Sequence, residues 1–389
     1  MRILYITAKD MLLWDEGKTI TIQSQYLKNY RENLRSIQDR KVWKQKSMTV
    51  AMGYNQPLQS LIPDREVENY RFTGLTPCGK TKTVIYAIQI DQMGGMFKVN
   101  AYSAVDMEGH IFHDKGIFIH NPSYNRKNGT LLYSLQRAGG QEDLQSQNLK
   151  SSEVHTLTDG DSVDAYPRWV EGSADTFVFQ SAGIGRSPTG GYMGLAPVTI
   201  NRMNVTSGAI EELVAFEHYD CLAPKMDKEG NLYYIKRPYR VDSLHNNNFL
   251  VDILLFPIRI INAIFNWLNM FSMMYSGKPL TSGSNPARQD GDPKKFTIHG
   301  NLVDAAKIMN DSSTMGGKHL GIVPRSWQLI KQSVNGNEEK LAEGVIAFDR
   351  SADGTIVCCN GKTIYTVENS GKKTTLIKEK FIEKVYVWE

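Results

Sequence analysis

The chain has 389 residues, of which 41% are hydrophobic and 22% charged, and its formal net charge at pH 7 is +4. This composition is typical of a folded globular protein with enough apolar side chains for one large all-β domain or two ordinary domains. The small net charge argues against a nucleic-acid-binding protein, which would show a concentrated basic stripe. We therefore expect no nucleic-acid partner.

The four cysteines are Cys78, Cys221, Cys358 and Cys359. Adjacent cysteines do not bridge easily, and no C-x-x-C spacing occurs, so we expect reduced thiols in a cytoplasmic protein. The amino terminus, MRILYITAKDMLLW, has no long apolar stretch and no small-residue cleavage site. A secretory signal is not expected there.

The first predicted strand is RILYITAKD, at the amino terminus. Residues 20–65 are harder to interpret, because they could complete a sheet or form a helix. Tyr26, Tyr30, Leu34 and Ile37 recur at three- and four-residue steps, which is the spacing of one helix face.

The segment GLTPCGKT, residues 74–81, matches the phosphate-binding pattern G-x-x-x-x-G-K-[ST]. That loop works when a strand precedes it and a helix follows, so that free backbone N–H groups point at the phosphates. Here the following residues, KTVIYAIQI, are β-branched and aromatic and indicate a strand. We therefore predict a turn between strands and disfavour nucleotide hydrolysis.

The same kind of glycine turn recurs along the chain, each time just before a β-like run. Successive turn glycines are 50, 43, 58 and 124 residues apart. One four-stranded propeller blade occupies roughly 40–50 residues, so the spacing favours repeated blades with one long insertion. The turn glycines are Gly79, Gly129, Gly172, Gly230 and Gly354.

The histidines of GHIFHDKGIFIH are His110, His113 and His120. On a regular strand His110 and His113 would point to opposite faces, so joint metal ligation is not expected. The segment DGDSVDAYPRW places Asp159, Asp161 and Asp164 in one loop, which could hold Ca²⁺. A polar turn whose aspartates cap backbone N–H groups is the favoured interpretation.

Residues 241–325 are predicted to be an insertion, mostly helical, between the second and third strands of the blade that begins near residue 218. Within it, residues 249–277 are almost continuously apolar, and a helix is expected at about 256–275. We expect this helix to dock on its own propeller, on a second subunit or partner, or on a membrane surface. Arg259 and three asparagines form one polar stripe along it, which argues against a helix that spans the membrane. The predicted contact residues are Ile260, Ile264, Phe265, Trp267, Leu268 and Phe271.

The carboxyl-terminal segment KFIEKVYVWE resembles the first strand of a blade, but no further strands of that blade follow it. The amino-terminal segment RILYITAKD resembles the second strand of a blade, but no first strand precedes it. A blade made from both ends would remove an exposed sheet edge. Each of the five turns indicates one blade, and the composite blade is the sixth, so we predict an all-β, six-bladed β-propeller. It would be a single domain over residues 1–389, with the insertion in one blade.

Two segments resemble the TolB-type, WD40-like propeller repeat, namely DGDSVDAYPRWVEGSADTFVFQS and HYDCLAPKMDKEGNLYYI. In that repeat an Asp and a Pro precede the turn glycine and an aromatic strand. The resemblance covers about residues 66–240 and 326–389, and near Gly79 and Gly129 the Asp is missing. It implies a binding platform and says little about the ligand. The matching residues are Asp164, Pro167 and Gly172, and Asp220, Pro224 and Gly230.

From these features we expect a non-enzymatic binding or scaffold propeller of a bacterial or similar cytoplasmic type, peripheral to a membrane if the insertion binds one. No cofactor is expected apart from the Ca²⁺ alternative. A propeller hydrolase with a metal ion at the central channel, using Asp161, Asp164 and Asp220, is the enzyme alternative. The residues expected to contact a ligand in the channel are Asp164, Arg168, His218 and Asp220.

Overall fold

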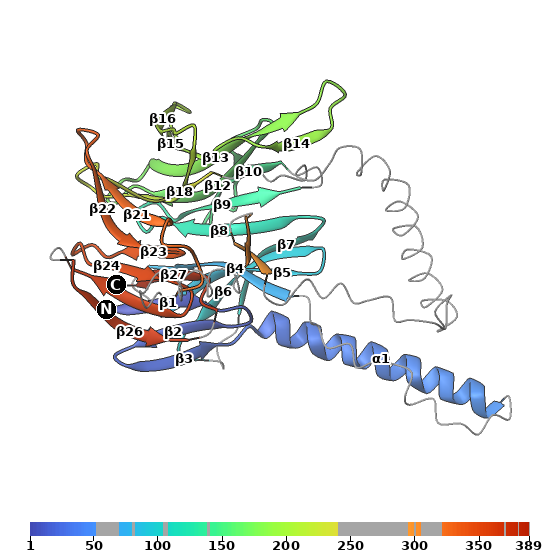
Figure 1. The fold of residues 1–389 in the computed structure, drawn as a ribbon. Helices are drawn as coiled ribbons and strands as arrows, with labels where there is room; N and C mark the ends of the chain where they lie inside the picture. Colours follow the sequence, from blue (N-terminus) through green and yellow to red (C-terminus); the bar gives the residue numbers. More distant parts are fainter. Residues whose placement is uncertain are drawn as a thin grey trace. The chain divides into compact units, whose positions relative to one another are not determined.

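The computed structural model describes residues 1–51, 70–79, 82–103, 108–137, 141–239, 295–298, 301–304, 321–368, 371–379 and 381–388. These residues are mostly β, as expected, with one helix in addition (Figure 1). The chain divides into two compact units. One comprises Met1–Glu32, Val67–Tyr239 and Lys307–Glu389, and the other comprises Asn33–Glu66 and Arg240–Ala306.

Most strands of the first unit form antiparallel groups of four, in which each strand pairs with the next. Three of these groups are built mainly from the amino-terminal half of the chain, and β27 comes from its carboxyl end. In pairing order they are β27 (Lys384–Trp388), β1 (Arg2–Ile6), β2 (Met11–Asp15) and β3 (Lys18–Ile22); β4 (Tyr70–Pro77), β5 (Thr83–Ile90), β6 (Met93–Asn100) and β7 (Gly109–Lys115); and β8 (Phe118–Tyr124), β9 (Thr130–Gln136), β10 (Glu142–Asn148) and β11 (Val154–Thr156).

Three further groups follow along the chain, and β14 (Tyr192–Leu195) adds a hairpin to β13. A single parallel pairing, Glu142 with Val163, joins β10 to β12. In pairing order the groups are β12 (Ser162–Trp169), β13 (Thr176–Arg186), β15 (Thr199–Asn204) and β16 (Ile210–Val214); β17 (Tyr219–Met226), β18 (Leu232–Pro238), β21 (Gln328–Gln332) and β22 (Glu338–Glu343); and β23 (Ala347–Arg350), β24 (Ile356–Cys359), β25 (Thr363–Val367) and β26 (Lys373–Lys378).

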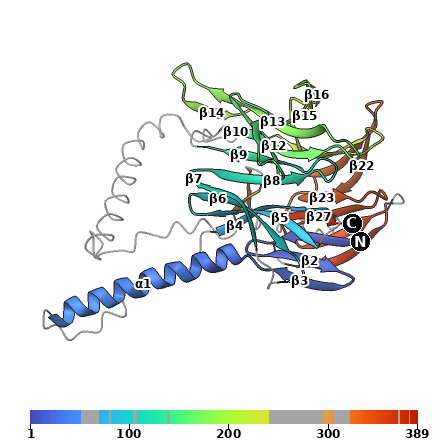
Figure 2. The same cartoon turned by 180° about the vertical axis from the view of Figure 1, so that it is seen from behind.

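The two ends of the chain share one sheet, as expected from their sequences. β27 pairs antiparallel with β1, from Arg2 opposite Trp388 to Ile6 opposite Lys384. The termini lie side by side in both views (Figures 1 and 2). Ile3, Leu4 and Tyr5 are fully buried, so the first strand contributes core side chains as well as backbone hydrogen bonds.

All five turn glycines have positive φ, between +74° and +90°. Each lies between the first and second strand of its group, where the left-handed conformation is accessible to glycine without a steric cost. Gly79 follows β4, and β5 begins at Thr83 with Pro77 opposite Val84. Residues 74–79 therefore belong to a β-hairpin, and a strand follows where a phosphate-binding loop needs a helix.

A second repeated feature is a β-bulge before a proline in the first strand of three groups. Register shifts occur between His120 and Ser123, between Ala165 and Arg168, and between Leu222 and Lys225. The residue before each proline has φ between +50° and +55°. These prolines thus mark positions where the first strand of the group bends. The residue pairs are Asn121-Pro122, Tyr166-Pro167 and Ala223-Pro224.

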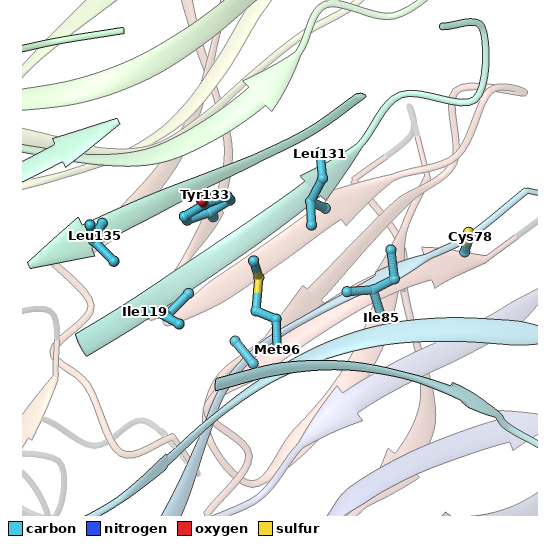
Figure 3. Close-up of a cluster of buried hydrophobic side chains, with 8 residues drawn as sticks. Cys78, Ile85, Met96, Ile119, Leu131, Tyr133 and Leu135 are labelled. Carbon is cyan, nitrogen blue, oxygen red and sulfur yellow. The ribbon is translucent and has the colours of Figure 1, made fainter. Parts of the chain in front are cut away.

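Apolar side chains fill the space between neighbouring sheets. Figure 3 shows one such cluster, in which β5 and β6 face β8 and β9. Alternate residues of β5 and of β9 belong to it, which is the period-two burial expected of stacked sheets. Its members are Cys78, Ile85, Ala87, Met96, Ile119, Leu131, Tyr133 and Leu135.

All four cysteines are buried thiols. Burial raises the pKa of Cys78, and raises the pKa of Cys221 and Cys359 to about 12. Because the thiolate is the reactive form, we expect slow reaction with a thiol reagent in native protein and rapid reaction of four thiols in guanidinium chloride. Spectrophotometric titration with 5,5′-dithiobis-(2-nitrobenzoate) measures the rate of thiol reaction in the native and the denatured protein. A thiol that reacts rapidly in the native protein would contradict the expected protection by burial.

The helix α1 (Gln25–Ala51) resolves the ambiguity of residues 20–65 in favour of the helical alternative over residues 25–51. Its amino terminus is capped, because the Ser24 hydroxyl accepts a 3.0 Å hydrogen bond from the Leu27 N–H. The Glu108 carboxylate accepts a 2.7 Å bond from the Tyr26 N–H. Ser24 and Glu108 both also bond the Tyr86 hydroxyl, so the first turn is attached to the sheet β4–β7.

The chain leaves its sheet after β18 and rejoins it at β21. Between them, β19 (Lys295–Ile298) and β20 (Asn301–Asp304) form a hairpin, so these residues of the predicted insertion are not helical. The apolar helix expected at 256–275 lies outside the described residues, together with its six predicted contact residues. Among the described residues, no helix combines the length and apolar character needed to cross a membrane.

Candidate functional site

The first strand of each four-stranded group contacts the first strand of another. These contacts use backbone oxygens and buried side chains. Thr73 of β4 donates to the Ile119 carbonyl of β8, and Trp169 of β12 donates to the Ser123 carbonyl of β8. Lys384 of β27 donates to the Thr73 carbonyl of β4, and Lys225 of β17 donates to the Arg350 carbonyl of β23. The Val387 N–H of β27 donates to the Asp349 carboxylate of β23, and the Glu171 N–H, just after β12, donates to the Met226 carbonyl of β17.

Lys384 occupies a junction of three sheets. Its Nζ donates a 2.6 Å hydrogen bond to the Thr73 carbonyl and a second bond to Oδ1 of Asn121. The ammonium also lies 5.1 Å from the centroid of the Tyr166 ring, which favours a cation. β27, β4, β8 and β12 therefore all contribute to the environment of this one amine.

Arg168 is a second cation in the same region. Its guanidinium lies 5.0 Å from the centroid of the Tyr386 ring, and Nη1 is 3.5 Å from the Pro122 carbonyl oxygen. The structure describes no ion pair for Arg168 or for Lys384 in the residues it covers. The carboxyl groups of Glu383 and Glu142 act on Lys384 through their charges, which partly oppose the lowering of its pKa.

Two buried carboxyl groups lie close by. Glu142, 8% exposed, begins β10, and Asp164, 5% exposed, accepts a 2.6 Å hydrogen bond from the Ser181 hydroxyl. Burial raises the pKa of Glu142 to about 7, although the Lys384 charge opposes this shift. Near neutral pH part of the Glu142 population is therefore uncharged and does not neutralise the two cations.

The same environment favours the neutral forms of the basic groups. Burial and the nearby Arg71 charge lower the pKa of Lys384 to about 7. Burial and the charges of Lys384 and Arg71 lower the pKa of His120 to about 3, so this ring is neutral. We call this group the Lys384 cluster; it consists of His120, Asn121, Glu142, Asp164, Tyr166, Arg168 and Lys384.

Two of the four channel residues predicted from the sequence belong to the cluster, namely Asp164 and Arg168. Asp220 lies instead in a buried ion pair, in which its Oδ2 is 2.9 Å from Nε of Arg237. His218 is exposed in the turn before β17, and its carbonyl accepts the Tyr239 N–H.

The aspartates of the 159–164 loop do not gather around a common point. Asp161 forms two 2.5 Å bonds with Arg186, Asp164 bonds Ser181, and Asp159 is exposed. Over the described part of the chain, no three His, Cys, Asp or Glu side chains are placed to hold a metal ion. Two of the three carboxylates in this loop are thus already engaged by other side chains.

Lys384 was not anticipated as a site residue. One sequence signal was available: Lys384, Tyr386 and Trp388 share one face of β27, and the two aromatic residues are buried. A lysine in register with buried aromatics indicates a charge turned toward the interior. Glu142, His120 and Asn121 carry no comparable signal, because their proximity to Lys384 depends on the contact between separate sheets.

No protein-family model and no curated protein matches this sequence. Solved structures with a similar fold include TolB from Acinetobacter baumannii, at 12% identity and a TM-score of 0.48, covering 99% of this chain and 66% of that one. The tricorn protease has 12% identity and a TM-score of 0.44, over 98% of this chain and 35% of that one. A protein from Lactobacillus plantarum has 9% identity and a TM-score of 0.43, over 100% and 99% of the two chains. This chain thus spans less than two thirds of TolB and about a third of the tricorn protease.

Proposed function

We propose that the protein is a non-enzymatic, six-bladed β-propeller that binds an anionic ligand at its centre. The six four-stranded groups would be the blades, with β27 and β1 closing one of them. The contacts between first strands support this closure, because they join each group to a neighbour. The Lys384 cluster would then line the central channel.

The observation that carries the ligand class is the pair of cations, Lys384 and Arg168, that form no ion pair with another described residue. Lys384 and Arg168 come from different sheets, and the acceptors of their hydrogen bonds are neutral oxygens, while the charges of Glu383 and Glu142 also act on Lys384. A carboxylate or phosphate that reached them would form charge-assisted hydrogen bonds in a partly desolvated place, where such bonds are strong. Asp164 is bonded to Ser181, and a neutral Glu142 would not compete with the ligand.

The pKa shifts predict how affinity depends on pH. The pKa values of Lys384 and Glu142 are both about 7, so below pH 7 the amine is charged and the carboxyl is neutral. Raising the pH removes the positive charge and creates a negative one, and both changes repel an anion. We expect affinity to fall by about tenfold or more between pH 6 and pH 9, with a smaller decrease in E142Q.

Thermal-shift titration with acetate, succinate, citrate and phosphate at constant ionic strength tests the site. At least one of these anions should raise the melting temperature of the wild-type protein at pH 6. K384M and R168M should lose this response, whereas K378M, which alters an exposed lysine of β26, should keep it. An equal response in wild type, K384M and R168M would refute the anion site, as would the absence of any wild-type response.

The attachment role of the insertion is a second part of the proposal and rests on the sequence. The apolar segment 249–276 would bind a protein partner, a second copy or a membrane surface in a cytoplasmic setting. The full chain and a variant lacking residues 249–276 should differ in oligomeric state, in flotation with liposomes or in co-purifying proteins. If the two forms are folded and equal in all three measurements, the attachment role is refuted.

A further inference from the structure

The edge strand β7 brings two histidines into contact. Nε2 of His110 lies 2.7 Å from Nδ1 of His113. The expectation that they point to opposite faces is wrong, because the register shifts and places Phe97 opposite His110 but Gly95 opposite His113. Since Phe97 and Gly95 are two residues apart, both histidines lie on one face of the sheet.

The neighbours of the two rings hold them in place. The Phe97 ring lies 5.5 Å from the His110 ring, and the Tyr26 ring lies 5.7 Å from the His113 ring, centroid to centroid. A Cβ on Gly95 would be 2.8 Å from the Phe97 ring and 3.0 Å from Cβ of His113. Glycine at this position therefore permits the close packing that orients both imidazoles.

We propose that His110 and His113 form a surface site for a divalent cation that prefers imidazole ligands, of the class of Zn²⁺, Cu²⁺ and Ni²⁺. Nε2 of His110 and Nδ1 of His113 would be the two ligands. Zinc–nitrogen bonds of 2.0–2.1 Å in tetrahedral geometry need a separation of about 3.3 Å between the nitrogens. A small rotation of the exposed rings widens the observed 2.7 Å to that value.

The protonation chemistry is compatible with this role. In the observed contact one ring donates N–H and the other accepts, so at least one imidazole is neutral. On binding, the donor ring transfers its proton to its other nitrogen, and both facing lone pairs become available.

Two protein ligands leave the remaining coordination positions to water or to an external group. No third His, Cys, Asp or Glu joins them in the part of the chain that is described. We therefore expect an exchangeable ion and not one required for folding. Cu²⁺ should bind more tightly than Zn²⁺ or Ni²⁺, and Mg²⁺ should not compete, because it prefers oxygen ligands.

Isothermal titration of the tag-free full chain with ZnCl₂ tests the proposal. Wild type should show one site that H110Q and H113Q each weaken by about tenfold or more. The matched control is H155Q, which alters an exposed histidine of β11 and should bind zinc like wild type. Circular dichroism spectra and melting curves identify any variant that has lost its fold.

Three results would overturn the site: no zinc binding by the wild type, binding by folded H110Q/H113Q within about twofold of the wild type, or displacement of zinc by equimolar Mg²⁺. The first shows that the ring geometry is insufficient for a metal. The second places the ion elsewhere. The third indicates binding to carboxylates.

Discussion

Replacing Asp220 by alanine should destabilise the protein by about 3–5 kcal/mol. The Asp220–Arg237 pair is almost completely buried, with the two side chains 5% and 4% exposed. Removing the carboxylate would take the Asp220 charge away from the buried guanidinium and would deprive the Val198 N–H of its 3.0 Å acceptor. Urea denaturation monitored by tryptophan fluorescence measures the loss.

The exposed pair Arg202–Glu211 provides the control. Its side chains are 41% and 59% exposed, so E211A should change the unfolding free energy by less than about 1 kcal/mol. The D220L/R237M double variant should recover much of the stability lost in D220A, because it removes both charges together. If D220A instead retained wild-type stability and lost the anion response, Asp220 would be a ligand-binding residue, as its sequence suggested.

Gly74→Ala should also be strongly destabilising, by about 1–3 kcal/mol or more. An added Cβ would lie 2.4 Å from Cδ of Pro122 and 3.0 Å from the Asn121 nitrogen, where β4 packs against β8. Because these are ring and backbone atoms, the strands must separate to accommodate the methyl group. Asn121 bonds Lys384, so the anion response should weaken as well.

Gly109→Ala is the matched control for this clash. Its nearest neighbour would be Cβ of Lys98 at 3.5 Å, an ordinary van der Waals contact. We expect a change within about 0.5 kcal/mol. Differential scanning calorimetry of both variants at one pH makes the comparison, and equal melting temperatures for G74A and G109A would contradict the close packing of β4 on β8.

The helix over residues 25–51 and the contact between His110 and His113 show where local patterns are insufficient. Spacing alone allowed residues 20–65 to be strand or helix. The helix begins where Ser24 caps it and where Glu108, more than eighty residues away, accepts the Tyr26 N–H. The histidines meet because β7 contains a bulge, and a shift of one residue in strand register changes the face on which every later side chain lies.

The sequence alone determined the features that depend on local backbone preference. The turn glycines mark the hairpins because left-handed φ strongly favours glycine, and the pairing of the two ends follows from two apolar strands that each lacked a neighbour. Only the tertiary structure decided which charges share an environment. Lys384, Asn121 and Glu142 are far apart in the chain, and their protonation depends on burial and neighbouring charges that arise when separate sheets pack together.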